Sequence, residues 1–277
     1  MTDFVSWFRG MDPRLQALFA GLLTLGVTSL GAGVVVFARR PPGQRWMVGM
    51  LGFASGIMLA ASFWSLLDPA IRMVEADGKP GWFPAAVGFL LGALFLRAAD
   101  AAIPHMRPFL EDEKPEGVRT GWKRPTLLVL AITMHNIPEG LAVGVAFGAA
   151  AIPELAAHGA SFAVAAALAV GIALQNFPEG LAVAMPLRAA GASRRRAFVG
   201  GTISAAVEPL AAVLGAAAVL AVRPLLPYTL AFAAGAMIYV VVDELIPESQ
   251  QGGHGDTATF ATMIGFAVMM VLDTALG

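Results

Sequence analysis

The chain has 277 residues, of which 57% are hydrophobic and only 13% are charged. A soluble domain carries roughly 25% charged residues, so this composition excludes an ordinary soluble protein and indicates one that crosses a membrane several times. The formal net charge of −1 gives no sign of a nucleic-acid partner, and we expect none. The chain has no cysteine, which excludes thiolate metal ligands and thiol catalysis.

Eight apolar segments are long enough to cross a bilayer, which requires about 20 residues each. We predict spans at residues 15–38, 46–68, 82–104, 125–149, 161–187, 196–222, 228–248 and 258–276. The expected fold class is therefore all-α, a polytopic membrane protein whose residues 1–277 form one transmembrane domain. The longest polar connection, 107–124, is predicted to be a cytoplasmic loop between the third and fourth spans.

The basic residues divide unequally between the two sides of the predicted membrane. One side has Arg39, Arg40, Arg45, Arg107, Lys114, Arg119, Lys123, Arg124, Arg188, Arg194, Arg195 and Arg196, and the other has Arg9, Arg14, Arg72, Lys79 and Arg223. Cytoplasmic loops carry an excess of Lys and Arg. We therefore expect an integral protein of the cell (inner) membrane, with lipid around it and both termini outside the cytoplasm.

A nine-residue pattern occurs twice, as HNIPEGLAV at 135–143 and as QNFPEGLAV at 175–183, and seven of the nine paired positions are identical. The copies lie in the fourth and fifth spans, which are consecutive and therefore antiparallel. Two antiparallel copies of one motif imply a local two-fold axis in the membrane plane, with a site near the midplane. If the other spans follow this symmetry, three precede the pair and three follow it, a 3+2+3 arrangement that no repeat in their own sequences shows.

The first and fifth residues of each copy share a helix face because they are four positions apart. If the two helices face each other, an imidazole, two carboxylates and several amides converge. This set suits a divalent first-row metal such as zinc, iron or manganese. Ionisable groups inside a membrane are costly and are functional candidates by default. The candidate metal ligands are His135, Asn136, Glu139, Gln175, Asn176 and Glu179.

Proline and glycine in each copy bear on how the two helices pack. Pro138 and Pro178 each remove a backbone hydrogen bond, and a carbonyl released in this way must face protein, water or an ion. Gly140 and Gly180 permit close helix packing or bending.

Other spans supply further polar groups. Glu208 beside a proline in the sixth span is a candidate ligand, and Met58 in the second span is a weaker one, since a methionine there is more often core packing. The acids of the seventh span, Asp243, Glu244 and Glu248, lie near its end, where solvation at the membrane interface explains them about as well as an ion path does. Asp100 and His105 lie near the inner end of the third span.

These motifs resemble those of the ZIP family of divalent metal transporters. The resemblance rests on His-Asn-X-Pro-Glu-Gly in the fourth of eight spans, the related motif in the fifth, the pair Glu208-Pro209 and the run 244–249. It covers the whole chain, although the outer spans match mainly by hydropathy. Three features depart from the family pattern. Many members have histidine where this chain has Gln175, some have an acid where it has Asn176, and the histidine-rich loop between the third and fourth spans is missing.

The resemblance implies uptake of a divalent cation as the substrate, with zinc most expected and cadmium, iron or manganese as further substrates. It implies a binuclear site, in which His135, Glu139, Gln175 and Glu179, with Met58, hold one ion. Asn136, Glu139, Asn176, Glu179 and Glu208 hold the second, so that both glutamates bridge. It further implies homodimers and movement of one helix bundle against another.

Two other functions remain open at this point. An intramembrane metal-dependent hydrolase would need a metal with an open position, a bound water and a general base. The sequence has no His-Glu-X-X-His motif, and we expect neither enzymatic activity nor an organic cofactor. A metal-selective channel is not separated from a carrier by the sequence. No Gly-rich phosphate loop is present that would bind ATP as a driver.

Overall fold

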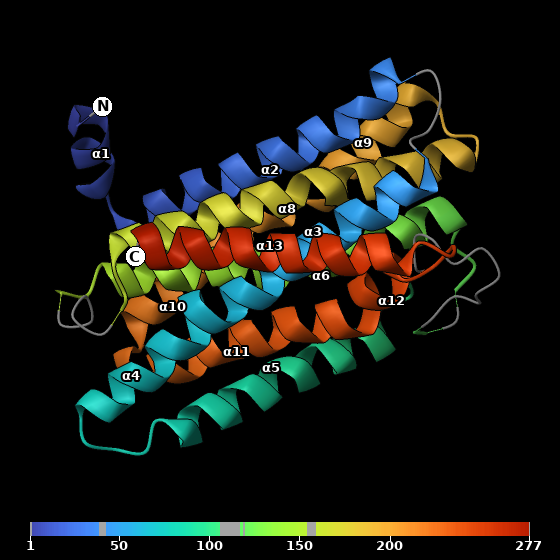
Figure 1. Ribbon diagram of the computed structural model, residues 1–277. Helices are drawn as coiled ribbons and strands as arrows, with labels where there is room; N and C mark the ends of the chain where they lie inside the picture. The colour runs from blue at the N-terminus through green and yellow to red at the C-terminus, as the bar shows by residue number, and fades with distance from the viewer. Residues whose placement is uncertain (1, 39–42, 106–116, 119, 154–158, 277) are drawn as a thin grey trace.

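The computed structural model describes residues 2–38, 43–105, 117–118, 120–153 and 159–276, and within these ranges it is built from helices. The predicted loop at 107–124 lies mostly outside the described residues. A short helix α1 (Thr2–Arg9) precedes eight long apolar segments (Figure 1). These segments are Pro13–Phe37, Gln44–Ala76, Trp82–Ala102, Thr126–Ala150, Phe162–Ala189, Arg194–Ala221, Leu226–Ser249 and Gly255–Ala275, each long and apolar enough to cross a membrane. The all-α, eight-span prediction is confirmed.

Five of these segments are single helices, and the other three are interrupted. The uninterrupted helices are α2 (Pro13–Phe37), α5 (Trp82–Ala102), α6 (Arg124–Ala150), α8 (Phe162–Ala189) and α13 (Gly255–Leu276). Helix α6, the fourth span, continues through Pro138 just as α8 continues through Pro178. The second span consists of α3 (Gln44–Ala61), the π-helical turn η1 (Ser62–Leu67) and α4 (Asp68–Ala76). The sixth consists of α9 (Arg194–Ser204) and α10 (Val207–Ala221), and after η2 (Arg223–Leu225) the seventh consists of α11 (Leu226–Val240), η3 (Val241–Leu245) and α12 (Ile246–Ser249).

The second span extends past its predicted end at residue 68, to Ala76. Pro69 occupies the first turn of α4, where a missing N–H costs nothing, and the π turn η1 precedes it. Asp68 forms an ion pair with Arg72 at 2.7 Å, one helical turn on. Sequence periodicity alone treats Asp68-Pro69 as a stop signal, whereas the π turn accommodates the proline and lets the helix continue.

Helix pairing follows the inverted repeat. The most extensive contacts join α2 to α8, α6 to α10, α3 to α13, and α5 to α11. In span numbers these pairs are 1–5, 4–6, 2–8 and 3–7. The inverted repeat exchanges spans 1, 2 and 3 with spans 6, 7 and 8, and span 4 with span 5. This exchange converts the contact between spans 1 and 5 into that between spans 6 and 4. It also converts the contact between spans 2 and 8 into that between spans 7 and 3. The π turns η1 and η3 also exchange, since they lie in spans 2 and 7. The three-two-three symmetry is therefore present in the packing.

These contacts define two groups of helices. The motif bundle contains α2, α6, α8, α9 and α10, which contact one another closely. The flanking bundle contains α3, α4, α5, α11, α12 and α13. Contacts of α8 with α3 and α13, and of α6 with α11, form the seam between the two bundles. The copies of the motif therefore lie on helices that reach this seam.

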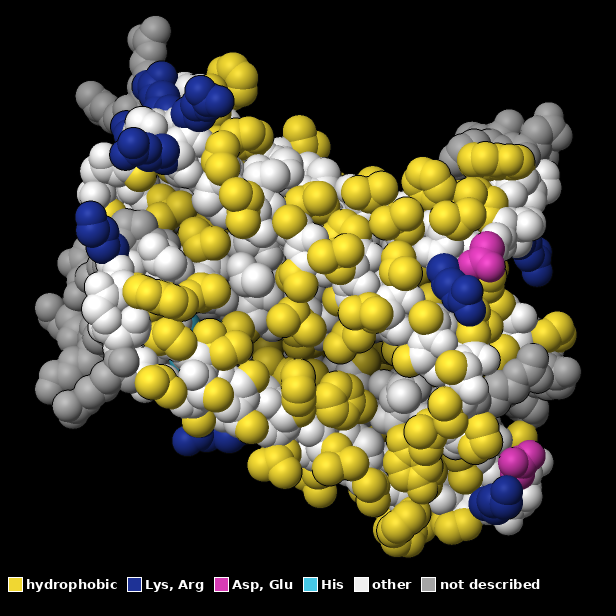
Figure 2. Space-filling view, turned by 180° about the vertical axis from the view of Figure 1, so that it is seen from behind, with side chains coloured by type: hydrophobic (Ala, Val, Ile, Leu, Met, Phe, Trp, Pro, Cys, Tyr) yellow, Lys and Arg dark blue, Asp and Glu magenta, His cyan; other side chains and the backbone are white. Residues whose placement is uncertain are grey.

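The outside of the molecule is apolar along its length. Large side chains such as Leu30, Leu94, Leu214 and Phe260 are more than 60% exposed, as a lipid-facing surface requires. The space-filling view shows hydrophobic side chains across the face, with Lys and Arg gathered toward its ends (Figure 2). Helices α2, α5 and α8 terminate at one end of the molecule, where α3, α6, α9 and α13 begin. We call this end the basic end. Arg45, Arg188 and Arg194 to Arg196 lie there.

Close helix contacts depend on glycine. A Cβ on Gly180 would lie 2.0 Å from the carbonyl oxygen of Thr28 on α2, and one on Gly140 would lie 2.5 Å from that of Glu208 on α10. On the other side of the α2–α8 contact, a Cβ on Gly31 would lie 2.0 Å from the carbonyl oxygen of Phe177. The predicted close-packing role of the motif glycines is confirmed.

Gly31→Ala should lower thermal stability in detergent, because the α2 and α8 backbones would have to separate. Overpacking of this kind costs about 1–3 kcal/mol. Gly26→Ala, on the same helix, is the matched control, because a Cβ there meets nothing within 4 Å. Equal melting temperatures for the two variants, measured by thermal unfolding in the same detergent, would contradict the close α2–α8 contact.

Candidate metal site

The repeated motif places six polar side chains in the interior of the motif bundle. His135 is 5% exposed, Glu179 is 4% exposed, and the other four are fully buried. All six lie on α6 or α8, about halfway along each helix. The carboxyl of Glu139 is close enough to those of Glu179 and Glu208 to interact electrostatically with both. The structure therefore brings the predicted acids of spans 4, 5 and 6 together.

Amide donors bind two of the three acids. Gln175 Nε2 donates to Glu139 Oε1 at 2.5 Å, which joins α8 to α6. Asn176 Nδ2 lies 2.9 Å from both carboxylate oxygens of Glu208, which joins α8 to α10. Each hydrogen bond pairs a residue of the second motif copy with an acid from another span. The amides thus hold the carboxylates in place at the centre of the bundle.

A helix break positions Glu208. The sixth span is interrupted at Ala205 and Ala206, so Glu208 lies in the first turn of α10, with Pro209 beside it. A break leaves carbonyls without intrahelical partners. Asn136 Nδ2 donates to one of these, the carbonyl of Ser204, at 2.9 Å. Glu208, the acid beside a proline that was identified in the sequence, thus lies in the first turn of α10 and faces the motif.

Several buried oxygens at this centre receive no hydrogen bond from the residues that the structure describes. They come from both copies of the motif: Asn136 Oδ1, Glu139 Oε2, Gln175 Oε1, Asn176 Oδ1 and Glu179 Oε2. A buried polar atom without a partner costs roughly 1–3 kcal/mol, and more when it is charged. Carboxylate and amide oxygens gathered in this way are ligands for a divalent cation. The donor set fits the predicted metal position.

His135 faces a residue outside the motif. Its Nε2 lies 2.6 Å from Glu244 Oε1 on η3, and both side chains are buried. The sequence left Glu244 open between solvation at the membrane interface and an ion path; with 4% of its surface exposed, it is an interior residue. Glu244 lies within the π turn η3, and the proline at 247, shortly after this turn, was the available sequence signal.

Met58 lies in the main hydrophobic core, 1% exposed, in a cluster that also contains Ile57 and Leu168. Its carbonyl accepts a hydrogen bond from Ser62 Oγ at 2.7 Å. Coordination by its sulfur stays a prediction. Thr24 on α2 contacts Glu208 and was not singled out in the sequence; its spacing of four from the buried Thr28 was the available signal.

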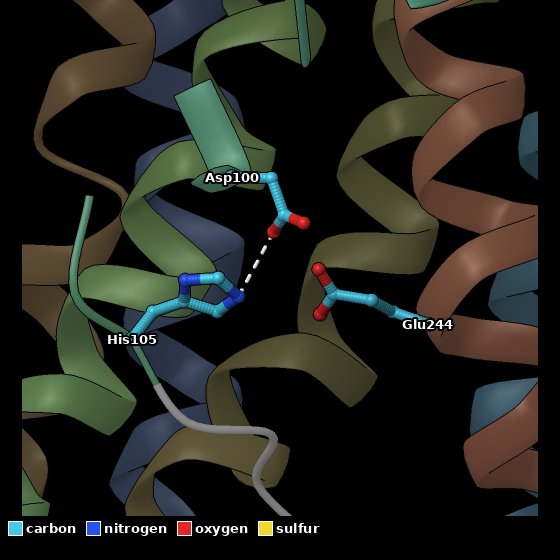
Figure 3. Close-up of side chains that lie close together, drawn as sticks. All are labelled: Asp100, His105 and Glu244. Carbon is cyan, nitrogen blue, oxygen red and sulfur yellow. Dashed lines mark ion pairs between the residues drawn. The ribbon is translucent and has the colours of Figure 1, made fainter. Parts of the chain in front are cut away.

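A second polar cluster lies between the motif and the basic end. Asp100, His105 and Glu244 each offer a ligand atom, and these atoms all lie within 4.8 Å of one another (Figure 3). His105 Nε2 is 2.9 Å from Asp100 Oδ1. Its Nδ1 is 2.9 Å from the carbonyl oxygen of Ile103, which can only accept, so Nδ1 carries the proton. Nε2 therefore faces the Asp100 carboxyl, and it would act as a ligand where a metal ion replaces the proton between the two groups.

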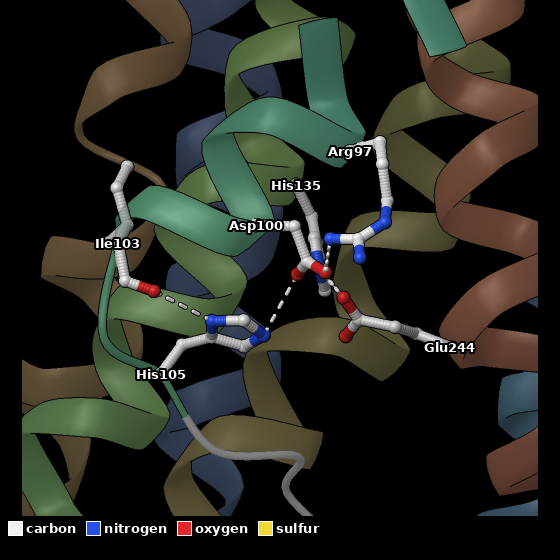
Figure 4. A network of polar contacts seen from close by, with 6 residues as sticks. All are labelled: Arg97, Asp100, Ile103, His105, His135 and Glu244. Carbon is white, nitrogen blue, oxygen red and sulfur yellow. Dashed lines mark hydrogen bonds and ion pairs between the residues drawn. The ribbon is translucent and has the colours of Figure 1, made fainter. Parts of the chain in front are cut away.

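The two clusters share Glu244. Figure 4 shows the carboxyl of Glu244 pointing toward Asp100, His105 and His135. Arg97, whose side chain is 61% exposed, lies 3.9 Å from Asp100 at the outer edge of this network. A chain of ionisable groups therefore connects the motif to the basic end.

Comparisons with known proteins identify the family of this chain. A family model described as "ZIP Zinc transporter" matches residues 111–273. The human protein "Zinc transporter ZIP11" is 43% identical, in an alignment that covers 97% of this chain and 99% of the relative. The chain belongs to the ZIP zinc transporter family. Other similar members are bacterial: "Zinc transporter GufA" of Myxococcus xanthus, 42% identical over 94% of this chain and 98% of the relative, and "Zinc transporter ZIPB" of Bordetella bronchiseptica, 39% identical over 94% and 81%.

Membership of the ZIP family confirms the family resemblance seen in the sequence. It also accords with an integral membrane protein, as do the eight apolar helices. These three relatives are named as transporters, which favours transport over hydrolysis for this ZIP-family chain.

Proposed function

We propose that this protein transports divalent metal cations, zinc foremost, through the site between α6 and α8 and into the cytoplasm. One observation carries the proposal: buried oxygens from both motif copies receive no hydrogen bond from the described residues. The names of the relatives point to zinc as the substrate. The excess of basic residues at one end supports that end as the cytoplasmic one, with both termini outside the cytoplasm.

We infer two ion positions that share Glu139 and Glu179. Gln175 contributes to the first position and Asn176 to the second, through the amide oxygens Oε1 and Oδ1, which accept no hydrogen bond from a described residue. Neutral amide oxygens bind zinc more weakly than imidazole or carboxylate does. We therefore infer moderate affinity, which suits a site that must release its substrate.

His135 belongs to two competing arrangements. Its Nε2 is hydrogen-bonded to Glu244, and the same nitrogen is the one that would ligate an ion beside Glu139. Only one of these contacts forms at a time. We infer that an ion leaving the motif passes from His135 to Glu244, and then to Asp100 and His105 near the basic end.

The driving force requires no ATP. A membrane potential negative inside favours entry by about 2.3 kcal/mol per charge per 100 mV, and twice that for a divalent ion. Protons and metal compete for the same histidine and carboxylate atoms, so protonation assists release on the cytoplasmic side.

Glu139→Gln should reduce zinc uptake into proteoliposomes to the level of empty vesicles, because it removes a shared negative charge. Folding should survive, because glutamine still offers an oxygen to Gln175 Nε2. A fluorescent zinc indicator inside the vesicles reports uptake, and the same assay ranks cadmium, iron and manganese. Glu75→Gln is the matched control, since Glu75 is exposed on α4.

Normal saturable uptake by Glu139→Gln would overturn the assignment of the site. Large single-channel currents in the wild type would show that the protein is a channel and not a carrier. Zinc bound by folded wild-type protein without any uptake would overturn transport itself.

Asp100→Asn should slow uptake several-fold at saturating zinc, because Asp100 belongs to the second polar cluster on the proposed exit route. The zinc affinity of the motif should stay the same, because Asp100 is not part of the motif. Rapid uptake measurements and equilibrium zinc binding separate the two effects. Asp77→Asn is the control, as Asp77 is an exposed acid whose ion pair with Lys79 is 3.5 Å long. An unchanged uptake rate for Asp100→Asn would remove this cluster from the route.

A further inference from the structure

An apolar groove opens on the seam between the two bundles, near the basic end. Its volume is about 620 Å³, and α3, α8 and α13 form its walls. The residues that matter here are Arg45, Trp46, Phe53, Leu174, Phe177 and Thr257. The groove is separate from the polar clusters, since no candidate metal ligand lines it.

The mouth of the groove has a cation and an aromatic ring. Arg45 lies in the first turn of α3 and donates from Nε to Thr257 Oγ1 at 3.2 Å. No carboxylate among the described residues forms an ion pair with Arg45, so its terminal nitrogens are available to an external anion. Trp46 is 51% exposed beside it. Tryptophan at a helix end is typical of the headgroup level of a membrane.

The depth of the groove matches a lipid tail. Arg45 and Phe53 are eight residues apart on α3, which corresponds to about 12 Å along the helix. Half of the hydrocarbon core of a bilayer is about 15 Å. A guanidinium at the mouth forms paired hydrogen bonds with a phosphate. The walls below it, with Phe53 and the 42% exposed Leu174, suit an acyl chain.

We propose that this groove binds an anionic phospholipid, with its phosphate on Arg45 and one acyl chain between α3 and α8. The charge of the basic end favours an anionic lipid over a zwitterionic one. A second copy of the chain fits less well, because it would have to supply both an anion for Arg45 and a narrow apolar insert for the groove.

The position of the groove links the lipid to the metal site. Phe177 and Pro178 line the groove, and they directly follow Gln175 and Asn176 on α8. A bound chain therefore contacts both bundles at the seam, beside the motif. The bound lipid sets how easily α8 moves against α3. This consequence for transport rests on the proposed function, whereas the binding of the lipid does not.

The test is native mass spectrometry of the full chain in detergent with phosphatidylglycerol or phosphatidylcholine carrying the same acyl chains. Wild type should retain one phosphatidylglycerol about tenfold more tightly than phosphatidylcholine. Both lipids offer a phosphate to Arg45, but the choline cation of phosphatidylcholine cancels the net negative charge that the guanidinium attracts. Arg45→Gln should lose this preference. Arg195→Gln, an exposed arginine at the same end that does not line the groove, should keep it.

Leu174→Trp fills the groove and should lower retention of both lipids, while its melting temperature in lipid-free detergent reports folding. Equal retention of the two lipids by wild type would overturn the proposal. So would equal weakening by Arg45→Gln and Arg195→Gln, which would indicate general charge attraction. A dimer that dissociates on Leu174→Trp, with lipid retention unchanged, would assign the groove to a second copy.

Zinc uptake into vesicles of each lipid then tests the consequence. Wild-type uptake should change several-fold between the two lipids, and uptake by Arg45→Gln should not. Absence of uptake in both lipids would count against the proposed function and leave the mass-spectrometric result standing. Lipid-independent uptake by wild type, with specific lipid retention, would overturn only the link to transport.

Discussion

The structure depends on one electrostatic constraint: the carboxyls of Glu139, Glu179 and Glu208 are gathered in the interior of a membrane-spanning bundle. Removing a carboxylate from water costs several kcal/mol even after the protein relaxes. Hydrogen bonds from the amides of Gln175 and Asn176 to Glu139 and Glu208 offset part of this desolvation cost. The oxygens that receive no hydrogen bond from described residues make the site complementary to a divalent cation. Helix packing, the glycine contacts and the break in the sixth span all serve to hold these groups together.

Much of this arrangement could be predicted from the sequence, because the signals are local. Apolar length gives the eight spans, and the repeated motif gives the antiparallel pair. The spacing of four places His135 and Glu139 on one helix face. Glu208 could be identified because an acid beside a proline is rare inside an apolar run, although the helix break that orients it depends on Asn136 and the carbonyl of Ser204.

What could not be predicted depends on contacts between distant spans. Glu244 reaches His135 across 109 positions in the chain, from within a π turn of the seventh span. The second span likewise continues past Asp68 through a π turn. No hydropathy pattern reports a π turn, because it changes the direction of side chains without changing their polarity. The exit cluster of Asp100, His105 and Glu244 was therefore visible only as scattered residues near span ends.

The central claim is that the substrate ion lies between the two motif copies. Crystals of the zinc-loaded protein, measured on both sides of the zinc absorption edge, locate the ion directly by its anomalous signal. We predict a peak between Glu139 and Glu179, within coordination distance of both carboxyls. A fully occupied peak at Asp100, His105 and Glu244, with none between the motif copies, would contradict it.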